Sequence, residues 1–234
     1  MKKKIDIICI ITARSGSKGL KNKNIRKLKG LPLIAHTIIA AKKSKMLTRV
    51  ILSTDSKLYA KIGSKFGVEV PFIRPKRLAT NTAHHPDVVN HALNFVEKKD
   101  RIKFDYVVML QPTSPFRKAK HIKESIKIFE KNYKADCLVS VQKCPHNMIP
   151  ESLMRKSKNF VQFNQKNLLF RKQDKPNYFA RNGAAIYITK YNRIQNYILG
   201  GKILYYEMNK IDSIDIDDYE DLEISRIIAK KINL

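Results

Sequence analysis

Apolar and polar positions along the chain predict strands and helices in alternation. Residues 7–12 form a continuous apolar run, which is typical of a strand buried on both faces. Residues 31–44 carry apolar side chains at helical spacing, and residues 56–67 predict a helix that Gly67 ends. We expect further strands at residues 49–55, 68–74, 106–110, 137–141, 184–188 and 202–208, and further helices at residues 85–99, 119–131 and about 218–232. This alternation favours an α/β fold, with a mostly parallel sheet flanked by helices on both faces.

Residues 144–180 interrupt the alternation. They are rich in Lys, Asn, Gln and Pro and contain only short apolar groups, which predicts an inserted hairpin or arm. Regular elements resume after this segment, and the sequence has neither an internal repeat nor a low-complexity linker. We therefore expect a single domain, residues 1–234, that carries the arm.

The chain carries far more positive than negative charge. Its 234 residues include 47 Lys and Arg against 20 Asp and Glu, a formal net charge of +27, while 43% of the residues are hydrophobic. That apolar fraction is ordinary for a globular protein and excludes a disordered or collagen-like chain. A positive field of this size attracts polyanions: nucleic acid, anionic membranes or polyphosphate nucleotides. Composition alone does not choose among them.

Cysteine usage and hydropathy indicate a cytoplasmic protein. The 3 cysteines, Cys9, Cys137 and Cys144, have no CxxC spacing, which argues against a disulfide framework or a zinc site. Met1 and the three lysines after it imitate the start of a secretory signal. The apolar run that follows is too short, however, and lacks a small-residue cleavage site. No stretch approaches the ~18 consecutive apolar residues of a membrane span.

The loop after the first predicted strand combines glycines, hydroxyl groups and cations. Within residues 13–24, Gly16 and Gly19 let the backbone turn and approach an anion closely. The donors and cations of the loop are Arg14, Ser15, Ser17, Lys18, Lys21 and Lys23. We interpret it as a phosphate-binding loop, although it matches neither the Walker A motif nor GxGxxG, which disfavours P-loop NTPases and dinucleotide dehydrogenases. The alternative is a solvated basic turn in a lysine-rich chain.

A second polar cluster, residues 110–117, follows the strand predicted at residues 106–110. Two prolines fix its backbone, so the polar side chains of Gln111, Thr113 and Ser114 have preset directions. Preset polar groups suit the recognition of a polyhydroxylated ligand. A proline-terminated strand that leads into a helix cap is an equally good interpretation of this cluster alone.

A third cluster, residues 213–221, is acidic. If residues 213–217 are extended, Asp215 and Asp217 project to one face and the intervening isoleucine to the other. Two neighbouring carboxylates repel, and Mg²⁺ held by carboxylates and substrate phosphates would remove that cost. The alternative is that the acidic residues complement the dipole of the last helix, a role that Asp218, Glu220 and Asp221 fit better. Because ligands of such sheets bind at the carboxyl ends of the strands, we expect the three clusters to converge there.

These segments, in this order, resemble the CMP-sialic acid synthetases, or acylneuraminate cytidylyltransferases. The motifs are ARSGSKGLKNKN, STD, IRPKRLATNTA, LQPTSPFR, RNGAAIYI and SIDIDDYEDLE, and together they span nearly the whole chain. The resemblance implies a Rossmann-like α/β fold and a homodimer in which an arm, here residues 144–180, is swapped between subunits. It also implies transfer of CMP from CTP to a nonulosonic acid, with Mg²⁺ as cofactor and pyrophosphate as product.

The resemblance also assigns roles to individual residues. The CTP phosphates would be bound by Arg14, Lys18 and Lys23 with help from Ser17, and the nucleoside by Asn24 and Arg74. The sugar would contact Gln111, Thr113, Ser114, Arg171, Asn182 and Tyr187. Asp215 and Asp217 would hold magnesium, and Arg14, Lys18 and Asp217 would carry the catalytic charge. The chain departs from the family pattern at Asn81, where Asp is common, at His84 and His85, which replace small hydroxyl residues, and at Ala180 and Arg181.

Other interpretations remain open at this stage. A nucleotidyltransferase for another sugar, such as legionaminate, or for another base would share the same fold and loop. Nucleic-acid binding would use the positive charge, but the basic residues are spread over every predicted helix and no nucleic-acid-binding motif is present. A metal site formed by His84, His85 and His91 has no standard zinc spacing.

Overall fold

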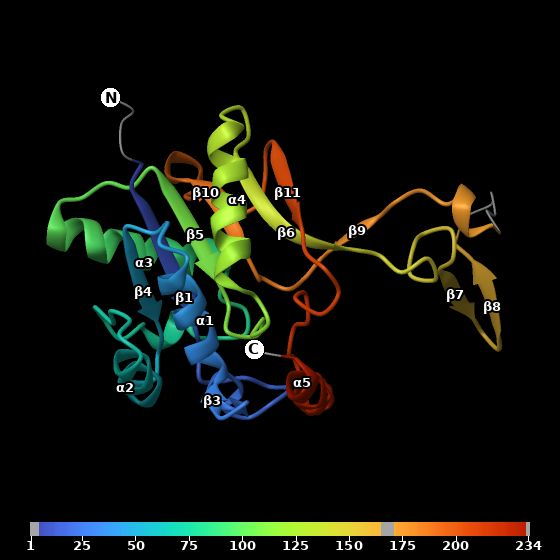
Figure 1. Cartoon of the computed structure of the whole chain (residues 1–234), viewed down its shortest axis with the longest axis horizontal. Helices are drawn as coiled ribbons and strands as arrows, with labels where there is room; N and C mark the ends of the chain where they lie inside the picture. The colour runs from blue at the N-terminus through green and yellow to red at the C-terminus, as the bar shows by residue number, and fades with distance from the viewer. Residues whose placement is uncertain (1–4, 165–170, 233–234) are drawn as a thin grey trace.

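A twisted, mostly parallel sheet forms the centre of the computed structural model, which describes residues 5–164 and 171–232 (Figure 1). Its strand order is β11-β6-β10-β5-β1-β4, with β9 paired to β6. Strands β4, β1, β5, β6 and β11 run in one direction, whereas β10 and β9 run in the other. The seven strands are β1 Ile7–Thr12, β4 Arg49–Ser53, β5 Tyr106–Leu110, β6 Cys137–Lys143, β9 Phe179–Arg181, β10 Tyr187–Lys190 and β11 Ile203–Glu207.

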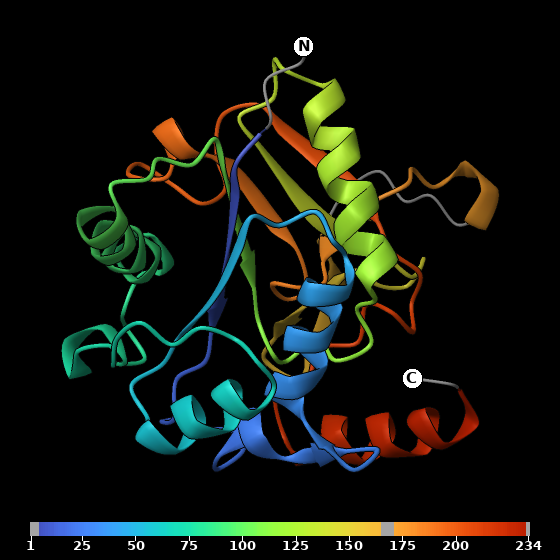
Figure 2. The ribbon, with the colours of Figure 1, turned by 60° about the vertical axis from the view of Figure 1, so that its left-hand side comes forward.

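Helices cover both faces of this sheet, as the sequence predicts (Figure 2). The helices are α1 Leu33–Lys43, α2 Lys57–Lys65, α3 His85–Asp100, α4 Ala119–Lys131 and α5 Tyr219–Lys231. One core cluster joins Ile7, Cys9 and Ile11 of β1 to α1, α2 and α4. Ile8 and Ile10 of the same strand face the other way, into a second cluster with α3. The continuous apolar run of β1 therefore reflects burial on both faces.

The prediction of a strand at residues 68–74 is wrong. It makes one isolated bridge, between Ile51 and Glu69, and no regular ladder. Pro71 lacks the N–H that a strand needs to continue pairing. The next backbone hydrogen bond between this segment and the chain at the end of β4 is made by Arg74, whose N–H donates to the Thr54 carbonyl at 2.8 Å. The predicted strand at residues 184–188 is likewise shifted, since the regular ladder of β10 begins at Tyr187.

The predicted arm contains a hairpin that projects from the body of the molecule (Figure 1). Its strands are β7 Met154–Ser157 and β8 Phe160–Phe163, and β6 and β9 connect it to the sheet. Two segments lie outside the described residues: residues 165–170 of the predicted arm, and residues 1–4, which imitate the start of a secretory signal. The short remaining elements are β2 Lys27–Leu28, β3 Leu31–Pro32 and the 3₁₀ turns Lys23–Ile25, Lys76–Leu78, Lys172–Asp174 and Tyr191–Arg193.

A third apolar cluster lies beneath one edge of the sheet and joins distant parts of the chain. Its buried members are Leu20, Leu28, Leu33, Phe116, Ile216, Leu222 and Ala229. They come from the basic loop, β2, α1, the proline-bounded loop, the aspartate segment and α5. The Ile216 N–H also donates to the Thr113 carbonyl at 2.8 Å, so the second and third polar clusters are linked through their backbones.

The start of α5 is fixed by its own side chains. Asp218 accepts a hydrogen bond from the Asp221 N–H at 2.9 Å, and the Asp221 side chain in turn accepts from the Asp218 N–H. Asp218 and Asp221 therefore cap the helix, which agrees with the alternative in which acidic residues at this end complement the helix dipole. Within residues 5–164 and 171–232, none of the helices combines the length and the apolar character that crossing a bilayer requires.

Candidate functional site

A cleft of about 530 Å³ opens at the carboxyl ends of β1 and β5. Among the residues predicted to function, its walls contain Arg14, Ser17, Lys18, Lys23, Asn24, Arg74, Gln111, Thr113 and Asp217. The basic loop and the aspartate segment therefore face one cleft, although Lys23 and Asp217 are 194 positions apart. Five other predicted residues are not part of the lining: Ser114, Arg171, Asn182, Tyr187 and Asp215. Of these, Arg171 is exposed on the arm.

A carboxylate from the neighbouring strand end holds the basic loop in place. The backbone N–H and the hydroxyl of Ser15 donate to Asp55 Oδ1 and Oδ2, at 2.9 and 2.6 Å. Buried Asn24 donates its side-chain amide to the Arg14 carbonyl at 2.9 Å and closes the loop. Sequence reasoning assigned Asp55 no role, although its position directly after a buried strand was an available signal.

Gly19 is the point where this loop meets the aspartate segment. A Cβ atom at Gly19 would lie 2.6 Å from the backbone carbonyl oxygen of Asp217, far inside van der Waals contact. Lys23 Nζ lies 2.9 Å from Asp217 Oδ1, and their side chains are 13% and 75% exposed. The missing side chain at position 19 thus allows two oppositely charged segments to share one end of the cleft.

Asp215 belongs to the same aspartate segment and is more enclosed than Asp217. The Ser114 hydroxyl donates to Asp215 Oδ1 at 3.5 Å. Gly183 has φ +64°, and a side chain there would collide with the Asp215 carboxylate. Burial, and after it the negative charge of Asp217, raises the pKa of Asp215.

This acidic pair fits a divalent cation. The ionised form of Asp215 is disfavoured by burial and by Asp217, and a bound cation would remove that cost. Within the described residues there is no group of three or more His, Cys, Asp or Glu side chains that could hold a metal by themselves. Mg²⁺ is commonly held by one or two carboxylates together with substrate phosphates, and Asp215 and Asp217 would supply the protein half of such a site. Their metal role stays a prediction.

Arg74 presents unsatisfied donors at the cleft. Its side chain is buried, and its Nε and Nη2 atoms have no hydrogen-bond partner among the described residues. Asp55 Oδ1 lies 3.9 Å from Arg74 Nη2, which balances part of the charge. Burial lowers the pKa of Arg74, an effect that the Asp55 charge opposes. A buried guanidinium with free N–H groups is costly unless an acceptor, such as a ligand carbonyl or phosphate, binds it.

Gln111 is held from behind by a buried arginine. Arg117 donates to the Gln111 carbonyl at 3.1 Å and to the Ala185 carbonyl at 2.9 Å, and burial lowers the pKa of Arg117 to about 10. The side-chain nitrogen of Gln111 lies 3.3 Å from His85 Nε2 on the cleft wall. Burial and then the positive charge of Arg74 lower the pKa of His85, so it faces the cleft as a neutral imidazole at pH 7.

Two of the predicted sugar-binding residues make contacts within the protein. The Asn182 side chain, only 2% exposed, accepts a hydrogen bond from Ser140 at 2.7 Å and donates to Ser213 Oγ at 3.0 Å. The Tyr187 hydroxyl donates to the Gly183 carbonyl at 2.8 Å. These contacts shape the chain behind Asp215, and a direct contact of either side chain with a sugar stays a prediction.

The alternative histidine metal site finds no counterpart in the structure. His91 packs edge-on against Phe72, with ring centroids 4.7 Å apart. No metal-binding group that includes His84, His85 and His91 occurs in the part of the chain that the structure describes. His85 instead belongs to the cleft wall beside Gln111.

The mostly parallel sheet with a cleft at its strand ends places the chain in the Rossmann-like α/β class, and comparisons with known proteins specify the family. Residues 8–231 match the family model described as Cytidylyltransferase. The chain therefore belongs to the cytidylyltransferase family. It is 36% identical over 230 residues to the N-acylneuraminate cytidylyltransferase of Escherichia coli O18:K1:H7, an alignment that covers 97% of this chain and 53% of that protein. The chain thus spans about half the length of this relative.

Two further similarities concern part of the sequence and the fold. Over 136 residues, 57% of each protein, the chain is 42% identical to the CMP-N,N'-diacetyllegionaminic acid synthase of Legionella pneumophila. A solved structure of CMP:2-keto-3-deoxy-manno-octonic acid synthetase complexed with CTP shares the fold, with a TM-score of 0.72. That alignment covers 97% of this chain and 100% of the other at 16% identity, so it concerns the fold alone.

We expect Gly19→Ala to force the basic loop and the aspartate segment apart, because the added methyl group meets a backbone carbonyl. Overpacking of this kind costs about 1–3 kcal/mol, and in a chain of this size each kcal/mol lowers the melting temperature by about 2–4 °C. Gly16→Ala is the control, since a Cβ atom there meets nothing within 4 Å. Thermal unfolding measures both variants. Equal melting temperatures for Gly19→Ala and the wild type would contradict the close approach.

We expect Asp215→Asn to stabilise the protein in a buffer that contains EDTA. The pKa of Asp215 is raised in the folded state, so its ionised form costs stability above the unfolded pKa of about 4, and the cost disappears as the pH falls. At pH 7.5 the melting temperature should rise above that of the wild type, and the gain should vanish as the pH falls to about 4. Glu220→Gln, an exposed acidic position, is the control. A decrease at pH 7.5 would refute the assignment.

Proposed function

We propose that this protein transfers CMP from CTP to the anomeric hydroxyl of a sialic-acid-like nonulosonic acid, in the first instance an N-acylneuraminate, and releases pyrophosphate. The observation that carries the proposal is the single cleft in which a cationic, glycine-containing loop faces Asp217, with Asp215 enclosed two residues away. Membership of the cytidylyltransferase family and the name of the Escherichia coli relative support it.

The basic loop would bind the triphosphate. Arg14, Lys18 and Lys23 supply positive charge on the cleft wall, and Ser17 supplies a hydroxyl donor. Asn24 and Arg74 would lie around the nucleoside, where the free N–H groups of Arg74 require an acceptor. Asn81, whose Oδ1 accepts a hydrogen bond from Arg14, keeps that guanidinium in place without neutralising it.

The reaction would depend on positioning and on charge neutralisation. The sugar hydroxyl attacks the α-phosphorus in line with the departing pyrophosphate, a type of transfer in which the protein mainly orients groups and stabilises charge. Arg14 and Lys18 would stabilise the negative charge that grows on pyrophosphate. Asp215 and Asp217 would hold Mg²⁺, which when bound neutralises phosphate oxygens and lowers the pKa of the attacking hydroxyl.

The sugar would occupy the end of the cleft near Gln111 and Thr113. Arg117 fixes the backbone of Gln111, so the direction of its amide is set before any ligand binds. Ser114, Asn182 and Tyr187 would support this side, Ser114 through Asp215. Arg171 lies on the arm and would reach the sugar side of a second copy of the chain.

We propose a homodimer in which the arms are exchanged. The arm carries large apolar side chains with much of their surface exposed, namely Leu153, Met154, Phe160, Val161, Phe163 and Phe179. Exposed apolar surface of this extent is typical of a protein–protein interface. We place the reaction in the cytoplasm, where the free thiols of Cys9, Cys137 and Cys144 are stable.

A second candidate substrate is a different nonulosonic acid. The segment shared with the Legionella pneumophila relative has the higher identity, 42%, and that protein is named for N,N'-diacetyllegionaminic acid. A further relative over 95% of the chain, 27% identical, is the pseudaminic acid cytidylyltransferase of Campylobacter jejuni. The fold and the loop would serve any of these sugars.

Pyrophosphate release from the full chain tests the proposal. CTP, UTP, ATP and GTP are each combined with N-acetylneuraminate, legionaminate and pseudaminate in the presence of Mg²⁺. We expect turnover with CTP and one or more of the nonulosonic acids. Turnover with another nucleotide alone would overturn the assignment of the base. Salt-sensitive DNA binding that CTP does not affect, without any turnover, would favour the nucleic-acid alternative.

We expect Asp217→Ala to abolish most turnover while CTP still binds. Loss of a group that stabilises transition-state charge lowers kcat by about 10²–10³-fold, whereas the cations of the basic loop remain. Glu220→Ala is the matched control, because it removes an acidic side chain three positions away that does not line the cleft. Calorimetry measures CTP binding, and pyrophosphate release measures turnover. Unchanged turnover in Asp217→Ala would remove Asp217 from the mechanism.

A further inference from the structure

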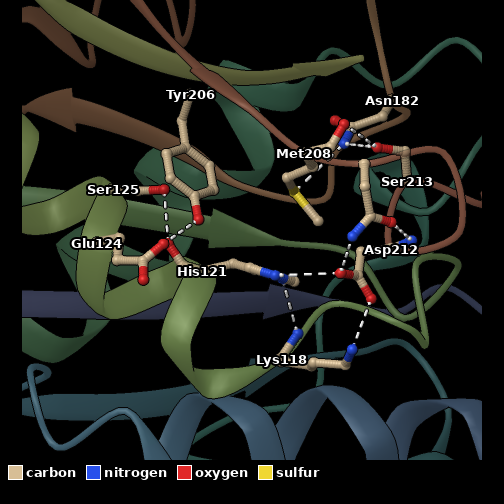
Figure 3. Close-up of polar contacts among 10 residues, drawn as sticks. Lys118, His121, Glu124, Ser125, Asn182, Tyr206, Met208, Asp212 and Ser213 are labelled. Carbon is tan, nitrogen blue, oxygen red and sulfur yellow. Dashed lines mark hydrogen bonds and ion pairs between the residues drawn. The ribbon is translucent and has the colours of Figure 1, made fainter. Parts of the chain in front are cut away.

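A buried polar network lies behind the aspartate segment, outside the cleft lining (Figure 3). Its centre is the Asp212 carboxylate, whose side chain is 1% exposed. Lys118 Nζ lies 3.0 Å from Asp212 Oδ1, and His121 Nε2 lies 3.3 Å from Oδ2. The Asn209 side chain donates to Oδ2 at 2.6 Å and accepts from the Asp212 N–H at 2.8 Å. A buried charge is tolerated only with such partners, so these interactions form a specific contact between α4 and the chain after β11.

His121 connects the two sides of the network through its two ring nitrogens. The Lys118 N–H donates to His121 Nδ1 at 3.1 Å and caps the start of α4. Nδ1 is therefore an acceptor, and the ring proton belongs to Nε2, which donates to Asp212. Burial lowers the pKa of His121, opposed by the charge of Asp212, which favours the neutral ring that the Nδ1 acceptor contact needs.

Other groups pack around His121. The Ser125 hydroxyl donates to the His121 carbonyl at 2.7 Å, and the Tyr206 ring of β11 lies with its centroid 6.2 Å away. The Tyr206 hydroxyl donates to Glu124, as Figure 3 shows. The charged groups that face the imidazole are therefore Lys118, Lys120 and Glu124 of α4 and Asp212 of the chain after β11.

The network connects directly to the acidic pair. Ser213 is the neighbour of Asp212, and its hydroxyl accepts a hydrogen bond from the Asn182 amide at 3.0 Å. The Ser213 N–H donates to the Asn209 carbonyl at 3.0 Å. The turn at residues 209–213 is thus fixed at two successive positions. Asp215 follows three residues after Asp212, so a shift of this turn moves the carboxylates of the pair.

We propose that His121 and Asp212 are positioning residues that hold residues 213–217 in the geometry in which Asp215 and Asp217 bind Mg²⁺ together with the nucleotide. The inference rests on the proposed function for its catalytic readout, but its structural core is the rigidity of this segment, which is measurable without any ligand. Supporting residues of metal ligands typically change metal affinity or activity by about 10–100-fold when they are lost.

The two ring nitrogens of His121 allow a matched pair of substitutions. His121→Asn places an acceptor near the position of Nδ1, which keeps the cap of α4 and removes the contact to Asp212. His121→Gln places an amide donor near the position of Nε2, which keeps the contact to Asp212 and removes the cap. Amide hydrogen exchange of residues 208–217, measured on the ligand-free protein, and the Mg²⁺ concentration for half-maximal turnover are the two readouts.

We expect His121→Asn to speed exchange in residues 208–217 and to raise the half-maximal Mg²⁺ concentration by about 10-fold, with KM for CTP at saturating Mg²⁺ within about 2-fold of wild type. His121→Gln should stay near wild type in both readouts, despite a lower melting temperature. Equal behaviour of the two variants, or unchanged exchange in His121→Asn, overturns the proposal.

Asp212→Asn keeps the proposal testable if His121→Asn fails to fold. This variant removes the buried charge but retains the size of the side chain, and it should speed exchange in the same segment. Exchange at wild-type rates in Asp212→Asn overturns the positioning role. Faster exchange in a protein that shows no CTP turnover refutes the proposed function and leaves the structural role of the network intact.

Discussion

The site depends on one close approach: the backbone of Gly19 against the backbone of Asp217. The third apolar cluster, which includes Leu20 and Ile216, lies directly beside this contact and holds the two segments together. Lys23 and Asp217 pair across the same junction. Burial of apolar side chains therefore provides the attraction between the two segments. The same contact brings the cationic loop and the acidic segment together at one end of the cleft. A cationic loop and an acidic pair would otherwise have no reason to remain at fixed separation in water.

The sequence was sufficient for the elements and for the convergence of the polar clusters. Hydrophobic runs such as residues 7–12 identify buried strands, and ligands of α/β sheets bind at strand ends. The strand predicted at residues 68–74 was wrong because the apolar composition of the segment outweighed Pro71, which lacks the N–H needed to continue a ladder. The resemblance supplied residue roles that spacing alone left open.

Contacts that depend on distant residues could not be predicted from the sequence. Asp55 supports Ser15, Arg117 supports Gln111, and Gly183 makes room for Asp215, yet none of these residues carries a local pattern that says so. The same holds for His121, whose two ring contacts become visible only when α4 and the chain after β11 are placed side by side. Side-chain support of this kind arises from tertiary packing, which a single sequence does not encode in any periodic signal.

The pairing of β9 with β6 limits how the arm can change in evolution. Val141 pairs with Arg181 and Lys143 with Phe179, and the chain then runs without a spacer into Asn182 and Gly183, beside Asp215. Losing one residue from either strand would turn every following side chain to the opposite face. The paired length of β6 and β9 therefore sets the distance between the arm and the cleft.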